Sequence, residues 1–306
     1  MRVTVLAGGT GGTKLAHGFA LLEPAVDLAI VANVGDDAEI HGLVVCPDID
    51  ALLYTLAGLV DAERGWGIAG DTMSAHAQFE RLGEPTWFTV GDADLATHVH
   101  RTRRLRHGDR LTDVVGAMAD ALGIHARVLP ATDDRHRTIV ETDEGALAFQ
   151  DYFVRRRQEP EVHRVRIDGN ARPTAEVLDA ISAADLVVIG PSNPIVSIGP
   201  ILELADVREA VRAARARAVA VSPIIGGKAL KGPADRMLTS LGHDSTALGV
   251  ARLYAGLVDR FVIDDTDAAL ASAIEGELEM AVEVLPTVMG SDDDRRRLAA
   301  ALLELA

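Results

Sequence analysis

A single cysteine, Cys46, occurs among the 306 residues, and aromatic residues make up only 4% of the chain. One thiol cannot form an intrachain disulfide framework or a cysteine-rich zinc site, which fits the reducing cytoplasm. The scarcity of aromatic side chains argues against a platform on which the bases of single-stranded nucleic acid would stack.

Positive charge is scarce too, since 30 lysine and arginine residues stand against 46 aspartate and glutamate residues, a formal net charge of -16. Such a surface repels polyanions, so we expect no nucleic-acid partner, and a phosphorylated ligand must be held by local donors or a metal ion. No window approaches the roughly 20 apolar residues of a membrane helix, and no signal peptide precedes the first apolar run. We expect a cytoplasmic protein without a membrane partner.

Short β-branched runs alternate with helical patterns, which predicts an α/β fold with a doubly wound, mostly parallel, Rossmann-like sheet. Strands are predicted at Val3–Ala7, Leu28–Val34, Ala184–Gly190 and Ala216–Ser222. Helices are predicted at Lys14–Leu22, Ile49–Val60, Thr174–Ala183, Val207–Arg215 and Ala234–Leu241.

The middle of the chain departs from this alternation. Several helices are expected from Asp71 to Leu122, and residues 137–150 alternate in the manner of a small hairpin. We therefore predict a Rossmann-like core that binds nucleotide or phosphate, residues 1–70 and 151–306, and a mostly helical insertion, residues 71–150.

The segment GGTGGTK, Gly8 to Lys14, lies between the first predicted strand and a helix. A glycine-rich turn at this place exposes backbone N–H groups at the positive end of a helix dipole, which suits a phosphate group. Lys14 stands where a dinucleotide fingerprint needs its last glycine, and Leu15 stands where a P-loop needs a hydroxyl. The alternative is a tight turn without a ligand, which four glycines and a lysine in one turn make the weaker interpretation.

Carboxylates follow the second predicted strand. NVGDD places Asn33, Asp36 and Asp37 at the carboxyl end of that strand, where a parallel sheet presents side chains to a ligand crevice. In CPDID, Asp48 is placed to cap the next helix and Asp50 lies in its first turn. Carboxylates beside a phosphate seat suit a magnesium ion, so we predict that Asp36 and Asp50 hold Mg²⁺.

Two further loops follow later strands and offer polar groups. PSNPIVSIGP supplies Ser192, Asn193 and Ser197, and SPIIGGKALKG supplies Ser222 and Lys228. Each loop alone is a weak signal, because such turns are often solvated surface. Three loops at strand ends, however, would converge on one crevice of a doubly wound sheet, where they could contact a base or a phosphate.

The predicted insertion contains tryptophan and histidine residues whose roles are less specific. Trp66, just before it, and Trp87 are expected in the core, although a planar substrate would need such faces. His98 and His100 are two residues apart and cannot share one face of a helix around a metal ion. We interpret both histidines as packing or surface residues.

Taken together, the chain resembles the 2-phospho-L-lactate transferase family of coenzyme F-420 biosynthesis. The motifs that carry the resemblance, in order along nearly the whole chain, are GGTGGTK, NVGDD, CPDID, WG with GDT, GDADLATH, LPATDD, FQDYFV, PSNPIVSIGPIL and SPIIGGKALKGPAD. The resemblance implies a magnesium-dependent enzyme that transfers phosphoenolpyruvate or 2-phospho-L-lactate from a guanosine diphosphate conjugate. The acceptor would be the ribityl hydroxyl of 7,8-didemethyl-8-hydroxy-5-deazariboflavin, with release of GMP, and we expect a homodimer.

The resemblance also implies roles for individual residues. Asp50 would orient the attacking hydroxyl as well as binding magnesium with Asp36, which makes both catalytic, and the insertion would contribute to the deazaflavin site. Thr89 departs from the family, because some members carry a basic residue there as a deazaflavin contact. Substrate contacts are expected from Gly9, Thr10, Gly11, Gly12, Lys14, Asn33, Asp37, Asp48, Thr89, Asp92, Ser192, Asn193, Ser197, Gly199, Pro200, Ser222 and Lys228.

Two other function classes fit parts of the sequence. A non-catalytic regulator that binds a nucleotide sugar, from a related family, would share the glycine-rich start and the Asp-Asp pair. Such a regulator is expected to continue into a basic, glycine-rich segment where this chain has HGLVVCPDID, so Asp48 and Asp50 favour the transferase. An NAD-dependent oxidoreductase is disfavoured by Lys14 in place of the last glycine.

Overall fold

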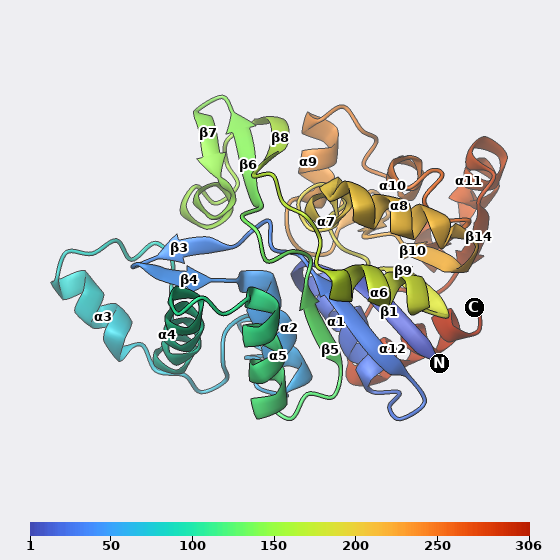
Figure 1. The fold of residues 1–306 in the computed structure, drawn as a ribbon. Coiled ribbons are helices and arrows are strands. Elements are labelled where there is room, and N and C mark those ends of the chain that lie inside the picture. The colour runs from blue at the N-terminus through green and yellow to red at the C-terminus, as the bar shows by residue number, and fades with distance from the viewer.

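A computed structural model describes residues 1–306, and its centre is a seven-stranded sheet in the order β14-β13-β10-β9-β1-β2-β5 (Figure 1). Every neighbouring pair of strands in this sheet is parallel. The predicted doubly wound α/β fold is therefore confirmed, with a central sheet that is parallel throughout. Its strands are β1 (Arg2–Ala7), β2 (Asp27–Ala32), β5 (Arg127–Pro130), β9 (Leu186–Ile189), β10 (Ala218–Val221), β13 (Arg260–Ile263) and β14 (Ala281–Val284).

The inner strands are apolar on both faces because helices cover both faces of the sheet. All residues of β9 and β10 are buried. Connections between parallel strands are right-handed. Helices that connect strands in one direction along the sheet therefore cover one face, and helices that connect strands in the other direction cover the opposite face. One layer contains α1 (Gly9–Ala20), α2 (Pro47–Leu56), α5 (Leu111–Ala121) and α12 (Asp292–Leu303), and the other contains α6 (Ala175–Ala183), α7 (Gly199–Glu203) and α8 (Ala205–Ala213).

The order of the strands fixes where a ligand crevice opens. From β1 the chain moves to β2 on one side, whereas from β9 it moves to β10 on the other side, and β1 and β9 are neighbours. Beyond the carboxyl ends of β1 and β9 the following segments diverge, which leaves a crevice at this switch point. The glycine-rich turn after β1 and the Pro191 loop after β9 meet there.

Three smaller sheets accompany the central one, and two of them lie at its edge (Figure 1). The predicted hairpin is confirmed as β6 (Arg137–Thr142) and β7 (Gly145–Ala148), and β8 (Val162–Asp168) completes an antiparallel sheet with it. A second hairpin, β3 (Ala38–Ile40) and β4 (Leu43–Val45), lies next to two helices of the predicted insertion, α3 (Ser74–Arg81) and α4 (Asp92–Arg106).

The division into core and insertion stays a prediction, but the strands cross its expected boundaries. Residues 71–150 include β5, which pairs with β2 in the central sheet, and residues 151–306 include β8, which pairs with β6. The elements not yet named are η1 (Asp151–Arg155), η2 (Arg215–Arg217), β11 (Ile224–Ile225), β12 (Lys228–Ala229), α9 (Ala234–Ser240), α10 (Ala247–Leu253), η3 (Asp265–Leu270) and α11 (Ala271–Leu278). None of the helices is both long enough and apolar enough to span a membrane.

Candidate functional site

A cavity of roughly 950 Å³ opens at the switch point. Its walls come from the start of α1, the end of β2, the helices α2 and α4, and the loops that follow β9 and β10. The three loops that the sequence expected to converge therefore do so. The predicted site residues that line this cavity are Gly9, Thr10, Gly11, Lys14, Asn33, Asp36, Asp48, Asp50, Thr89, Ser192, Asn193, Ser197 and Ser222.

Close backbone approach explains the glycines at the start of α1. Gly9 has φ of +62°, a left-handed conformation that other residues rarely adopt. A Cβ on Gly11 would lie 1.9 Å from the carbonyl oxygen of Pro191, so only glycine lets α1 pack this closely on the loop after β9. The backbone N–H groups of Thr10 and Gly11 have no acceptor in the protein, and both residues line the cavity, so these groups are free donors for an anion.

Asp48 and Asn33 connect this turn to the two neighbouring elements. The carboxylate of Asp48 accepts hydrogen bonds from the N–H of Gly9 (2.7 Å) and from the Asn33 amide (2.9 Å). Asn33 also donates to the carbonyl of Val196 and accepts from the N–H of Gly35. The expectation that Asp48 caps its own helix is wrong, because α2 has no side-chain cap and Asp48 instead binds the start of α1.

Asp36 is a buried carboxylate that lacks a partner. Its Oδ1 atom accepts no hydrogen bond, while Gln150 holds its backbone carbonyl at 3.0 Å. Burial, followed by the nearby charges of Asp48 and Asp37, raises the pKa of Asp36 well above its ordinary value. A buried carboxylate in this position needs either a proton or a cation, so Asp36 fits the predicted role of magnesium ligand.

Asp50, the second predicted magnesium ligand, has its charge already paired. The guanidinium of Arg101 on α4 donates to both carboxylate oxygens, with Nη1 3.2 Å from Oδ2. No three carboxylate, histidine or cysteine side chains are grouped to hold a metal ion by themselves. A magnesium ion here would therefore take most of its ligands from phosphate oxygens and water, which is how Mg²⁺ is usually bound beside phosphates.

A network of buried polar side chains surrounds Asp50. His98, interpreted from sequence as a packing or surface residue, is buried in the cavity wall with Nδ1 3.7 Å from Oδ2 of Asp50. Its Nε2 lies 3.4 Å from Oδ1 of Asp94, which accepts a 2.6 Å hydrogen bond from the Tyr54 hydroxyl. The sequence analysis missed Tyr54, Asp94 and Arg101, although their spacing along α2 and α4 places them on the facing sides of these helices.

Cationic side chains line another part of the cavity. Lys14 donates from Nζ to the carbonyl oxygen of Met289 at 2.9 Å, and burial, with the charges of Arg295 and Lys231, lowers the pKa of its ammonium group. Lys14, Lys231 and Arg295 all line the cavity. They provide local positive charge in a chain that is acidic overall, as an anionic ligand requires.

The loop after β9 contributes hydroxyl groups. The Ser192 hydroxyl is buried without a hydrogen-bond partner, and Ser197 also lines the cavity. Asn193 uses its side-chain oxygen within its own loop, where it accepts from the N–H of Ile195 at 2.9 Å. Ser222 accepts from the N–H of Ile224 in the same manner after β10. Of Ser192, Asn193 and Ser222, only Ser192 therefore has a side-chain polar group without a hydrogen bond.

The position of Trp66 also differs from the one expected from the sequence. It was predicted in the core, yet 44% of its surface is exposed, and it lines the cavity. The guanidinium carbon of Arg64 lies 5.1 Å from the centre of its ring, which fixes the ring by a cation–π interaction. Trp87 is half-buried and packs edge-on against Phe88.

Several predicted site residues lie outside the cavity wall. Gly12 packs under Ser192, and Asp37 is buried with its carboxylate 3.4 Å from Arg137. The carboxylate of the half-buried Asp92 accepts from the N–H groups of Ser74 and Ala75. The residues that do not line the cavity are Gly12, Asp37, Asp92, Gly199, Pro200 and Lys228.

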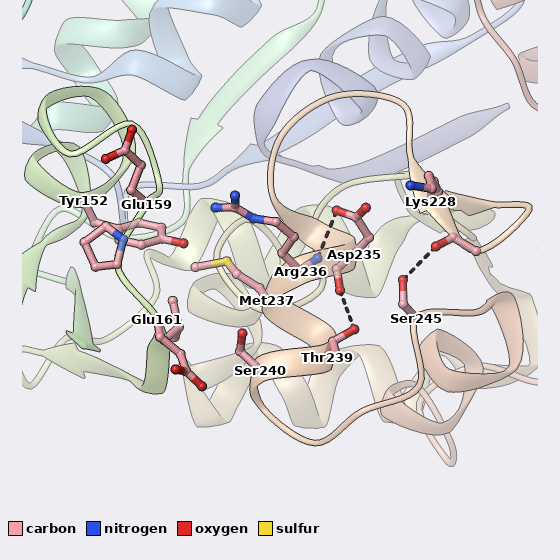
Figure 2. A pocket seen from close by; sticks show the side chains of 13 residues that line it. Tyr152, Glu159, Glu161, Lys228, Asp235, Arg236, Met237, Thr239, Ser240 and Ser245 are labelled. Carbon is pink, nitrogen blue, oxygen red and sulfur yellow. Dashed lines mark hydrogen bonds between the residues drawn. The ribbon is translucent and has the colours of Figure 1, made fainter. Parts of the chain in front are cut away.

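Lys228 lines a second, smaller cavity of roughly 370 Å³ between α9 and residues 159–162. Figure 2 shows Lys228 at one side of this cavity and Tyr152 at the other, with Arg236 between them. Gly199 and Pro200 begin α7, where the carbonyl of Pro200 is 2.7 Å from His136 Nε2. A substrate contact by any of these residues stays a prediction.

Comparisons with known proteins identify the family. The model of the 2-phospho-L-lactate transferase CofD family matches residues 3–293. A 2-phospho-L-lactate transferase of Methanothermobacter thermautotrophicus is 38% identical over 98% of this chain and 97% of its own. A phosphoenolpyruvate transferase of Streptomyces griseus is 39% identical over 100% of this chain and 98% of its own.

A solved structure supports the fold. A member of the UPF0052 family from Bacillus halodurans superimposes with a TM-score of 0.63 and 18% sequence identity, covering 99% of this chain and 98% of its own. At this identity the likeness concerns the fold alone. The family model and the relatives, which cover almost the whole sequence, show that this chain belongs to the 2-phospho-L-lactate transferase CofD family.

Proposed function

We propose that this protein transfers a phosphoenolpyruvate or 2-phospho-L-lactate group from a guanosine diphosphate conjugate to the ribityl hydroxyl of a deazaflavin, with release of GMP. Relatives that carry either donor name are almost equally similar to the chain, at 38% and 39% identity, so both donors belong to the proposal. We also propose that the reaction needs magnesium and that the enzyme is a homodimer.

One juxtaposition supports this function most strongly. Thr10 and Gly11, whose backbone N–H groups are free, line the same cavity as Asp36, whose buried Oδ1 accepts no hydrogen bond. Donors of this kind at a helix start suit a phosphate, and an unpaired carboxylate beside it suits the cation that accompanies a phosphate.

In this proposal the diphosphate lies against the start of α1, and Lys14 adds positive charge on the same side of the cavity. Magnesium, when bound at Asp36, would neutralise charge on the phosphate oxygens. Asp50 accepts a hydrogen bond from the acceptor hydroxyl and orients its oxygen toward the phosphorus. The hydroxyl proton passes to solvent as the hydroxyl oxygen forms a bond to the attacked phosphorus. The bond between this phosphorus and the oxygen that bridges it to the phosphorus of GMP breaks, and its electron pair leaves with GMP.

The direct test is incubation of the purified protein with the deazaflavin, magnesium and each guanosine-linked donor in turn, with mass analysis of the products. We expect GMP together with a phosphodiester of the deazaflavin from at least one donor. Absence of product with both donors, combined with tight binding of a nucleotide sugar, would instead favour a regulator. Light scattering of the same sample tests the homodimer.

A further inference from the structure

Arg101 is the bulkiest side chain with no exposed surface in the molecule. It lies on α4, and its guanidinium donates to both oxygens of Asp50 on α2 and to the carbonyl of Val44 in β4 at 3.2 Å. Its Nη1 is also 3.4 Å from Nδ1 of His98. Residues on α2, β4 and α4 therefore surround the guanidinium of Arg101. Asp50 lines the cavity and Arg101 does not, so the guanidinium lies behind Asp50 in the cavity wall.

Stability alone does not explain a buried ion pair of this kind. Removing two charges from water costs much of what their attraction contributes, and well-packed apolar residues of similar volume are commonly as stable. A planar guanidinium bound to both oxygens does, however, fix the plane of a carboxylate, which a point charge does not. The arrangement therefore specifies the orientation of Asp50 rather than the stability of the fold.

The remaining lone pairs of Asp50 have a defined direction as a result. An ionised carboxylate offers about four acceptor positions, and the guanidinium occupies one on each oxygen. Asp50 lines the cavity, as do Tyr54, Asp94 and His98, and Nδ1 of His98 lies 3.7 Å from Oδ2 of Asp50.

We propose that Arg101 is the positioning residue of the reaction: it holds the Asp50 carboxylate so that its free lone pairs receive the hydroxyl of the acceptor. The inference rests on the proposed function and names a residue outside the cavity wall. Because Arg101 acts through Asp50, its loss is expected to slow the reaction step and to leave binding of the guanosine-linked donor unchanged.

The test compares Arg101→Met with the wild-type enzyme in the steady state, with Arg252→Met as the matched control. Arg252 also binds a carboxylate, Glu277, through two nitrogens, but on the exposed surface. We expect Arg101→Met to lower kcat by about 100-fold, as a misplaced group does, with the KM of the donor changed less than about twofold. Arg252→Met is expected to retain the kcat of the wild type.

Two further measurements separate positioning from a structural role. In an Asp50→Asn background, Arg101→Met is expected to cause no additional loss of kcat, because the residue through which it acts is absent. Added guanidinium ion is expected to restore part of the kcat of Arg101→Ala, and Arg101→Lys, which lacks the planar fork, is expected to stay well below the wild type.

The outcomes are distinct. If the wild-type enzyme forms no product with either donor, the proposed function fails. If the wild type is active and Arg101→Met retains its kcat, or loses kcat equally with and without Asp50, the positioning role is overturned. If Arg101→Met does not fold, the comparison of Arg101→Lys with the wild type and the guanidinium rescue of Arg101→Ala decide the question, and failure of rescue overturns the proposal.

Discussion

The backbone N–H of Gly9 donates a 2.7 Å hydrogen bond to Oδ1 of Asp48, which joins the start of α1 to the start of α2. The other oxygen of Asp48 accepts from Asn33 at the end of β2, so three elements meet at one carboxylate. Because Asp48 satisfies only the first N–H of α1, the next two remain for a ligand. The seat for an anion is thus already held in place by the protein's own hydrogen bonds.

The close packing of this seat leads to a stability prediction. Gly11→Ala would place a Cβ 1.9 Å from the carbonyl oxygen of Pro191, and we expect the free energy of unfolding to fall by about 1–3 kcal/mol. Gly116 on α5 is the matched control, since a Cβ there meets nothing within 4 Å. Gly116→Ala is expected to raise the free energy of unfolding by about 0.5–1 kcal/mol. Urea unfolding measures both, and equal effects would contradict the packing argument.

The buried Asp37 predicts a pH dependence of stability. Burial raises its pKa from 3.8 to about 7, although Arg137 opposes the shift. Between these values the folded protein keeps a proton that the unfolded chain has released, so the free energy of unfolding falls as the pH rises through this window. Asp37→Asn removes this contribution. As the pH rises through the window, the free energy of unfolding of the variant is expected to increase relative to that of the wild type by up to about 1.4 kcal/mol per pH unit.

Urea unfolding of wild type and Asp37→Asn at several pH values, in the presence of a chelator, checks this slope. The same substitution at the exposed Asp206 controls for the loss of one carboxylate. A difference between Asp37→Asn and the wild type that stays constant with pH would show that Asp37 is ionised in the folded protein throughout the window.

Asp36 carries the prediction about magnesium. Since Asp36 lines the cavity and its Oδ1 accepts no hydrogen bond, Asp36→Asn is expected to raise the Mg²⁺ concentration for half-maximal activity by more than about tenfold. Calorimetric titration of Mg²⁺ into the protein with GDP present is expected to show the same weakening without turnover. Full activity of the wild type after removal of magnesium by a chelator would refute the magnesium requirement itself.

The sequence could predict those features of the fold and the site that are determined by residues adjacent in the chain. Short apolar runs and glycine-rich turns identified β1, β2, β9 and β10 and the loops after them, because alternation and turn chemistry are properties of adjacent residues. The strand β5 was placed in an insertion, since its RVLP run is too short to separate from a loop by pattern, and only pairing with β2 makes it a strand.

The missed parts of the site depend on long-range contacts. Asp48 has the local position of a helix cap, but its partner Gly9 lies 39 residues earlier. Arg101 occurs in a basic run that is typical of a solvated helix surface, and its burial follows from Asp50, 51 residues away on another helix. Such roles follow from how two helices pack, which a single sequence does not specify.

Trp66 leads to the last prediction, on substrate binding. Trp66 is exposed at the cavity, and its ring, which Arg64 holds, offers a flat apolar face. Of the planar groups in the two substrates, the tricyclic deazaflavin is larger than guanine. We expect Trp66→Ala to raise the KM of the deazaflavin by about tenfold, which corresponds to about 1.4 kcal/mol, with kcat nearly unchanged. Trp66→Phe is expected to retain most of the affinity.

Leu82→Ala is the matched control for Trp66, because this exposed side chain lies outside the cavity. Its KM values are expected to equal those of the wild type. If Trp66→Ala raises the KM of the guanosine-linked donor instead, the ring that stacks there is guanine and the acceptor lies elsewhere in the cavity. Because Asp50 must reach the acceptor hydroxyl, the two KM values together determine on which side of Asp50 each substrate binds.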